Sequence, residues 1–171
     1  MTDPLLVTLQ LEDRAFERFD GERRRWFPAE RNHVPAHVSL FHQLPGERLD
    51  EVAGALEDVA DEHAPFAVEA TGVRFLGRGS AYTLESDELA AVHGALAERF
   101  APWLTEQDRQ PYRAHVTIQN MADPDDAKQA FAELEAGFAP FTFTATGLEL
   151  WWYRGGPWAP ADVVPFAGAA E

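Results

Sequence analysis

The sequence contains His37-Val38-Ser39-Leu40 and, later in the chain, His115-Val116-Thr117-Ile118. Each stretch is a histidine, an apolar residue, a hydroxyl residue and a second apolar residue. Successive side chains of a β-strand point to opposite faces, so the histidine and the hydroxyl share one face and the apolar pair shares the other. Each stretch therefore predicts a strand that carries an imidazole beside a hydroxyl. Half-buried strands also alternate polar and apolar residues for purely structural reasons. The functional interpretation of the two stretches therefore depends on the sequence around them.

A second pair of matching stretches follows the first. Residues 66–73 (FAVEATGV) and 141–148 (FTFTATGL) share a frame of Phe, three residues, Ala-Thr-Gly and an aliphatic residue. Each lies at nearly the same spacing from its histidine motif, with a helix-like stretch between. This is an internal repeat, and two copies of one unit pack most economically about a pseudo-twofold axis. Such packing would bring the two histidine strands to face each other across one cleft.

With both motifs and the repeat in register, the chain resembles the two-histidine (2H) phosphoesterases, a superfamily that includes the bacterial 2′-5′ RNA ligase-like proteins and cyclic phosphodiesterases. Its signature is a pair of His-x-Ser/Thr-x (HxTx) motifs, one per lobe, as in HVSL and HVTI here. The resemblance covers nearly the whole chain. It implies an α+β fold of two pseudo-twofold-related lobes, each an antiparallel sheet with helices on its outer face, around a central cleft. We expect residues 1–171 to form this single domain, with halves at about 30–100 and 108–166.

The resemblance implies a catalytic set of His37, Ser39, His115 and Thr117. Opening a 2′,3′-cyclic phosphate, or making a 2′-5′ linkage, moves one proton off the attacking oxygen and another onto the departing one. Two imidazoles can do both near neutral pH, and two hydroxyls can donate hydrogen bonds to the non-bridging oxygens. This chemistry needs no metal and no cofactor. Ser39 could instead be a nucleophile, but its flanks lack the Gly-x-Ser-x-Gly elbow.

Further residues are candidates for substrate binding. Tyr112 and Arg113 lead into the second motif, at the mouth of the predicted cleft. Strand alternation places Phe41 on the face of His37 and Ser39, and places His42 on the apolar face as a hydrogen-bonded structural histidine. The aromatic run at 151–153 packs mainly in the core, although one of its rings could stack on a base. The substrate-binding candidates are Phe41, Tyr112, Arg113, Trp152 and Tyr153.

Other features favour structural interpretations. The run 23–25 (Arg-Arg-Arg) is typical of a solvated helix end, and 77–80 (Gly-Arg-Gly-Ser) is more typical of a hairpin turn than of a phosphate cradle. His33 and His37 have helical metal-ligand spacing, but Pro35 between them disfavours a helix. Apolar spacing predicts helices near 13–26, 49–59, 86–100 and 124–137. Strands are expected at 5–11, 37–44, 66–84 (as a pair), 115–121, 141–153 and 162–166.

Composition limits the partners. The formal net charge is −15, and such a surface repels a phosphate backbone at long range. Among the substrates that the resemblance implies, we therefore expect a small nucleotide or an RNA terminus, with no extensive non-specific nucleic-acid binding. There is no cysteine, no apolar run long enough to span a membrane, and no basic start typical of a signal peptide. We expect a cytoplasmic monomer without membrane contact.

Two non-enzymatic hypotheses stay open at this point. The chain could be a nucleotide or RNA-end binding module that has the two-lobed cleft without catalysis. It could also be a scaffold whose repeats are only structural, which would leave four polar residues facing a cleft without purpose. The presence of both histidines and both hydroxyls favours a metal-independent phosphoesterase.

Overall fold

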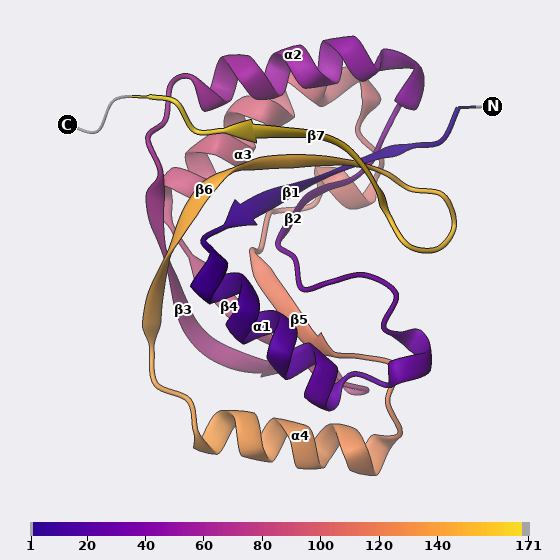
Figure 1. Ribbon diagram of the computed structural model, residues 1–171, viewed down its shortest axis with the longest axis vertical. Coiled ribbons are helices and arrows are strands. Elements are labelled where there is room, and N and C mark those ends of the chain that lie inside the picture. Colours follow the sequence, from indigo (N-terminus) through magenta and orange to yellow (C-terminus); the bar gives the residue numbers. More distant parts are fainter. Residues whose placement is uncertain (1, 169–171) are drawn as a thin grey trace.

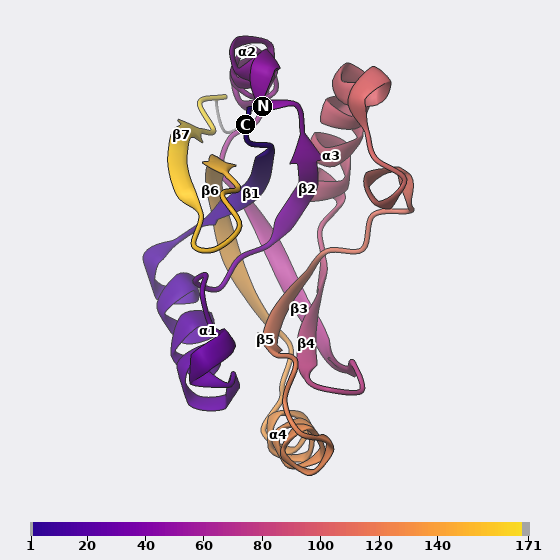
Figure 2. The same ribbon diagram turned by 90° about the vertical axis from the view of Figure 1, so that its right-hand side faces the viewer.

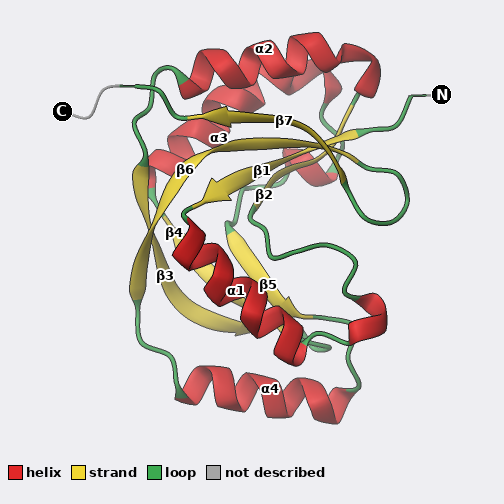
Figure 3. Ribbon diagram, in the orientation of Figure 1, coloured by secondary structure: helices red, strands yellow, loops and turns green. Residues whose placement is uncertain are grey.

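The computed structural model describes residues 2–168, which form one antiparallel sheet with helices packed around it (Figures 1 and 3). The sheet order is β2-β1-β6-β3-β4-β5, and β7 also pairs with β6. The α-helices are α1 (Asp13–Trp26), α2 (Leu49–Ala60), α3 (Asp87–Phe100) and α4 (Pro124–Ala136). The strands are β1 (Leu5–Leu11), β2 (Ser39–Leu44), β3 (Phe66–Phe75), β4 (Ser80–Glu85), β5 (His115–Gln119), β6 (Phe141–Trp152) and β7 (Ala159–Pro165).

The elements repeat. The order β1-α1-β2-α2-β3 is followed by β4-α3-β5-α4-β6, which confirms two related lobes. Each lobe takes its third strand from the other half, because β6 pairs with β1 and β3 pairs with β4. Where β3 meets β6, Phe66 pairs with Ala145 and Ala70 pairs with Phe141. The Phe of each repeat thus pairs with the Ala of the other repeat, as a pseudo-twofold axis requires. The repeating units begin earlier than the predicted 30–100 and 108–166, since each histidine motif belongs to the second strand of its unit.

Each half packs its first helix against the motif strand of the other half. Figure 2 shows α1 and α3 on opposite sides of the sheet, with α2 and α4 at its two ends. Helix α1 contacts β5, and its fully buried Phe19 packs on Tyr82, Phe141 and Phe143. Phe100 of α3 packs edge-on against Phe41 of β2. Burial of these rings adds to the hydrophobic core that the two halves share.

The strand β2 is irregular, and this changes which side chains face outward. Its register with β1 shifts between the pairs Leu5–Leu44, Val7–Phe41 and Thr8–Ser39. Such bulges place an extra residue in one strand and re-aim the side chains that follow. The prediction that Phe41 faces the cleft and His42 the core is therefore wrong: Phe41 is fully buried and His42 is exposed.

The local predictions hold elsewhere. The segment 76–79 is a hairpin turn, closed by a hydrogen bond from Leu76 N to Gly79 O and with Gly77 at φ 89°. Ser86 caps α3 by accepting a hydrogen bond from Leu89 N at 3.1 Å. Helix α4 begins at Pro124, as predicted, although the Asp123 side chain makes no capping bond. No helix in residues 2–168 is long and apolar enough to cross a membrane.

Candidate active site

The two motifs lie at the starts of β2 and β5. Their apolar residues Val38, Leu40, Val116 and Ile118 are buried, so the period of two sends the histidines and hydroxyls to the opposite face. Ser39 and His115 line one pocket of about 170 Å³. His37 lies in the segment just before β2, close enough that charge on His115 lowers its pKa. The structure therefore brings residues of both motifs to the same region of the sheet.

Both imidazoles are held in the same way. Nδ1 of His37 lies 2.9 Å from the Pro35 carbonyl oxygen, and Nδ1 of His115 lies 2.9 Å from the Arg113 carbonyl oxygen. A carbonyl oxygen only accepts hydrogen bonds, so each Nδ1 carries the proton. In a neutral ring the lone pair is then on Nε2. Each motif thus presents Nε2 as the nitrogen that can take or give a proton.

The surroundings of His37 keep its ring neutral. The ring of Trp158 covers it at 4.6 Å between centroids, and burial lowers the pKa of His37 to about 4. The bond to Pro35 opposes this shift, while the charges of Arg23, His115 and His42 add to it. By contrast, His115 is exposed. At neutral pH, His37 is therefore unprotonated and able to accept a proton.

In each half of the chain, the backbone of the motif accepts a hydrogen bond from a side chain of the other half. Arg23 of α1, almost fully buried, donates to Thr117 O at 2.9 Å and to Val34 O at 3.2 Å. Tyr112 donates its hydroxyl to Ser39 O at 2.8 Å. Arg23 is therefore a structural clamp between the two motif segments, which differs from the solvated helix end that the Arg run predicts. Both hydroxyl residues are fixed by a contact from the other half.

Tyr112 is positioned by an aromatic stack and lines the pocket, and its contact with a substrate stays a prediction. Its ring lies parallel to that of His93 at 4.0 Å, and His93 lies parallel to Phe41 at 4.8 Å. Burial raises the pKa of Tyr112 and lowers that of His93. Phe41 is thus a core residue beneath the site, and its predicted substrate contact is wrong. Arg113 lines the pocket together with His115, at the predicted mouth.

Comparison with known proteins identifies the family. The family model described as the 2′-5′ RNA ligase superfamily matches residues 11–157. The chain belongs to the 2′-5′ RNA ligase superfamily. This membership confirms the 2H phosphoesterase resemblance and supports an activity of the phosphoesterase or RNA ligase type. No curated protein sequence matches the chain significantly.

Solved structures of the superfamily have the same fold. TT0787 from Thermus thermophilus is 16% identical with a TM-score of 0.70, and the alignment covers 98% of this chain and 100% of that one. LigT from E. coli in complex with 3′-AMP is 15% identical with a TM-score of 0.64, covering 97% and 99%. LigT in complex with NADP⁺ is 14% identical with a TM-score of 0.63, covering 98% and 99%. At these identities, the likeness concerns the fold.

The aromatic residue that covers a motif histidine is not one of the predicted pair. Trp152 is partly buried and packs on the core side of β6, with its ring against Gly46, and its contact with a substrate stays a prediction. Tyr153 is exposed just beyond β6, and its contact with a substrate stays a prediction. Instead, Trp158 covers His37 and packs 6.0 Å from Trp151. The buried Leu148 and Leu150 lie on the same face of β6 as Trp152, so alternation along the strand places its ring on the core side.

The sequence interpretation also missed a histidine–aspartate pair. His42 Nδ1 lies 2.9 Å from Asp108 Oδ1, and both residues line the pocket with Ser39 and His115. No sequence signal pointed to this pair, because the bulge that turns His42 outward is set by the pairing of β2 with β1. The predicted hydrogen-bonded role of His42 holds, but its predicted burial does not.

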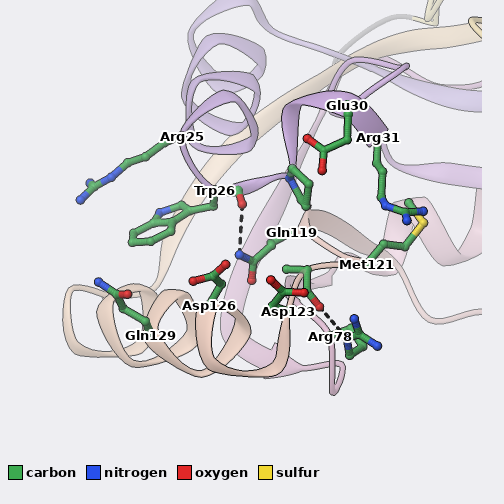
Figure 4. Close-up of a pocket in the computed structure, with 12 residues that line it drawn as sticks. Arg25, Trp26, Glu30, Arg31, Arg78, Gln119, Met121, Asp123, Asp126 and Gln129 are labelled. Carbon is green, nitrogen blue, oxygen red and sulfur yellow. Dashed lines mark hydrogen bonds between the residues drawn. The ribbon is translucent and has the colours of Figure 1, made fainter.

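A larger pocket of about 490 Å³ lies elsewhere, beyond Gln119 at the far end of β5 from His115 (Figure 4). Its lining carries charges of both signs, with Arg31 and Arg78 facing a region that also holds Asp123 and Asp126. Arg78 is committed to a hydrogen bond with Ala122 O. This pocket contains neither histidine motif. Within residues 2–168, no cluster of three or more His, Cys, Asp or Glu residues has the arrangement of a metal site.

Proposed function

We propose that the protein is a metal-independent phosphoesterase that acts on 2′,3′-cyclic phosphate or 2′-5′ phosphodiester bonds of RNA ends or small nucleotides. The observation that carries this proposal is the matched orientation of His37 and His115. Each Nδ1 is bound to the backbone carbonyl two residues earlier, which leaves Nε2 for the substrate. An acid and a base in equivalent geometry are what an in-line displacement at phosphorus requires.

In hydrolysis of a 2′,3′-cyclic phosphate, Nε2 of neutral His37 takes a proton from the attacking water. A bond forms between the water oxygen and phosphorus, and the bond to one ribose oxygen breaks. His115, protonated at Nε2, gives its proton to that departing oxygen. The hydroxyls of Ser39 and Thr117 donate to the non-bridging oxygens and stabilise the charge that builds on them. Ligation uses the same groups in the same direction, with the 5′-hydroxyl of a second RNA end attacking phosphorus in place of water.

The lowered pKa of His37 supports this division of roles. A base must be unprotonated at the working pH, and the cover of Trp158 favours that form. His115 is exposed beside Arg113 and can exchange its proton with solvent after turnover. Productive enzyme needs His37 neutral and His115 charged. The rate is therefore expected to be bell-shaped in pH, with limbs that belong to the pair.

The substrate class is supported by charge and by relatives. LigT has been crystallised with 3′-AMP, ATP and NADP⁺, all small nucleotides. The net charge of −15 disfavours long RNA, which would be repelled outside the immediate site. Together these observations favour a nucleotide or a short RNA terminus over an extended strand.

The test is turnover of adenosine 2′,3′-cyclic phosphate and of 2′-5′ linked ApA, each assayed with and without excess EDTA. We expect a nucleoside monophosphate or nucleoside product, and a rate that EDTA leaves unchanged. Loss of activity on chelation, restored by a divalent ion, would contradict the metal-independent mechanism. Tight binding of both compounds without turnover would instead make the protein a nucleotide-binding module.

A further inference from the structure

A third imidazole reaches the pocket that the two motifs share. The His42 side chain is 41% exposed, while the carboxylate that it contacts, Asp108, is 1% exposed. His42 follows Ser39 by three residues in β2, and three residues of extended chain span about 10 Å. The proposed mechanism uses neither His42 nor Asp108. The pair thus lies within one nucleotide's reach of the hydroxyl that binds the reacting phosphate.

Asp108 holds His42 in one orientation. Its carboxylate accepts the N–H groups of His42 at 3.0 Å and of Gln43 at 3.1 Å, besides Nδ1 of His42 at 2.9 Å. Burial opposes ionisation of this carboxyl, but the bonds from His42 and Gln43 outweigh it and lower the pKa of Asp108. The ionised carboxylate accepts from Nδ1 and so fixes the proton of His42 on that nitrogen. Nε2 of His42 is then directed away from Asp108.

The charge of this pocket contrasts with that of the whole chain. Among the residues that line it, Asp108 is the one carboxylate, and its oxygens are occupied by β2. Arg113, His42 and His115 line the same pocket. In a chain of net charge −15, a pocket with these donors and one engaged carboxylate favours an anion.

We propose that His42, oriented by Asp108, forms with Arg113 a subsite for a second phosphate group of the substrate. This inference rests on the proposed function and narrows its substrate class. The preferred substrates carry another phosphate next to the reacting one, either as a diester in an RNA terminus or as a monoester on a nucleoside bisphosphate. A plain nucleoside cyclic phosphate leaves the subsite empty.

Binding measurements test the subsite without requiring catalysis. Isothermal titration calorimetry would compare adenosine 3′-monophosphate, adenosine 3′,5′-bisphosphate and the dinucleotide ApAp on the parent protein and on His42→Gln. We expect the parent to bind the two-phosphate ligands about tenfold more tightly than the monophosphate, as one charge-assisted contact provides. His42→Gln should lose most of this preference. The bisphosphate carries its second phosphate as a monoester, and the dinucleotide carries it as a diester. Comparing the affinities of these two ligands shows which form the subsite prefers.

Matched control variants distinguish a specific loss of the subsite from a general loss of ligand binding or folding. His33→Gln changes an exposed histidine that does not line the pocket, and it should keep the preference. Arg113→Gln should weaken the preference in the same direction as His42→Gln. If His42→Gln weakens all three ligands equally, or if its preference equals that of the parent, the subsite is wrong.

Kinetics then distinguishes this inference from the proposed function. The parent and His42→Gln would be assayed on adenosine 2′,3′-cyclic phosphate and on ApA with a terminal 2′,3′-cyclic phosphate. We expect the preference for the dinucleotide, expressed as the ratio of the two kcat/KM values, to fall about tenfold in His42→Gln, mostly through KM. Absence of turnover for both substrates would contradict the proposed function, and the binding ratios would still decide the subsite. Turnover with an unchanged ratio would contradict the subsite alone.

Discussion

The segments around His37 and His115 share a backbone plan and differ in what covers each imidazole. In both, the ring donates from Nδ1 to the carbonyl two residues earlier, and a hydroxyl residue follows two positions later. His37, however, lies under Trp158 and near the charge of Arg23, whereas His115 is exposed. The repeat therefore sets the geometry of both rings, whereas the burial that lowers the pKa of His37 is local to that ring.

This difference has a physical origin in the last strand. Trp158 belongs to the turn between β6 and β7, and β7 has no counterpart in the first repeat. The hairpin folds an aromatic ring onto His37, and the removal of water disfavours the charged imidazole. Under the proposed mechanism, this one added hairpin makes His37 the base of the pair.

The largest expected effect comes from removing either imidazole. His37→Ala and His115→Ala should each lower kcat/KM by about 10²–10⁴-fold, the usual contribution of a positioned base or acid. The double variant should lose much less than the product, because the two rings act in one step. Steady-state kinetics on adenosine 2′,3′-cyclic phosphate measures this, with His33→Ala as the exposed control. A folded His115→Ala protein with the parental rate would refute the paired mechanism.

The hydroxyls should come next. Ser39→Ala and Thr117→Val each remove one donor to the non-bridging oxygens, and each should lower kcat by about 10²-fold in steady-state assays. The two effects should be similar, since the hydroxyls hold equivalent places in the repeat. Retention of parental kcat by Thr117→Val would show that the second hydroxyl is not a phosphate ligand and that the motifs are functionally unequal.

Trp158→Ala addresses the asymmetry itself. Exposing His37 to water should raise its pKa from about 4 towards the ordinary 6.5, so that the base becomes protonated as the pH falls below 6.5. The acidic limb of the kcat/KM profile should move to higher pH, and the rate at pH 5 should fall about tenfold for each unit by which the pKa exceeds 5. Trp152→Ala, on the core side of β6, is the matched control for the pH profile. An unmoved acidic limb in Trp158→Ala would mean that Trp158 does not set the state of His37.

Tyr112→Phe should have the smallest effect. It removes the hydrogen bond to Ser39 O and keeps the stack on His93, so kcat should fall about fivefold, as expected for one neutral hydrogen bond. If the phenol acts only through this backbone contact, KM should change little. A large rise in KM with unchanged kcat would instead place Tyr112 against the substrate.

Much of the fold could be predicted from the repeat. The period-two pattern of each motif and the Phe and Ala-Thr-Gly frame indicated the two lobes, because both depend on short-range alternation that the strands keep. The pairing of β6 with β1 joins strands that are far apart in the sequence. No local pattern in the sequence predicts that these two strands pair. The predicted halves were displaced for the same reason, since nothing in the sequence ties β1 and α1 to the first motif.

The site residues were predictable where alternation is regular and not where it breaks. Ser39 and His115 share a pocket, and their positions follow from the motifs. Phe41 and His42 exchanged roles because of the β2 bulge, which depends on tertiary pairing. Trp158 reaches His37 only through the path of a turn, which no local pattern specifies. Arg23 belongs to the run of three arginines at 23–25, and nothing in that run distinguishes it from the solvated side chains of a helix end.

An NMR titration of the imidazole nitrogens measures most directly whether two equivalent rings have different protonation states. Long-range ¹H–¹⁵N spectra of the parent protein, assigned with His37→Gln and His115→Gln, report both the tautomer and the pKa of each ring. We expect both neutral rings to carry the proton on Nδ1, and His37 to remain neutral until the pH falls towards 4. A proton on Nε2 of either neutral ring, or a His37 that titrates near its ordinary value, would contradict the assignment of base and acid.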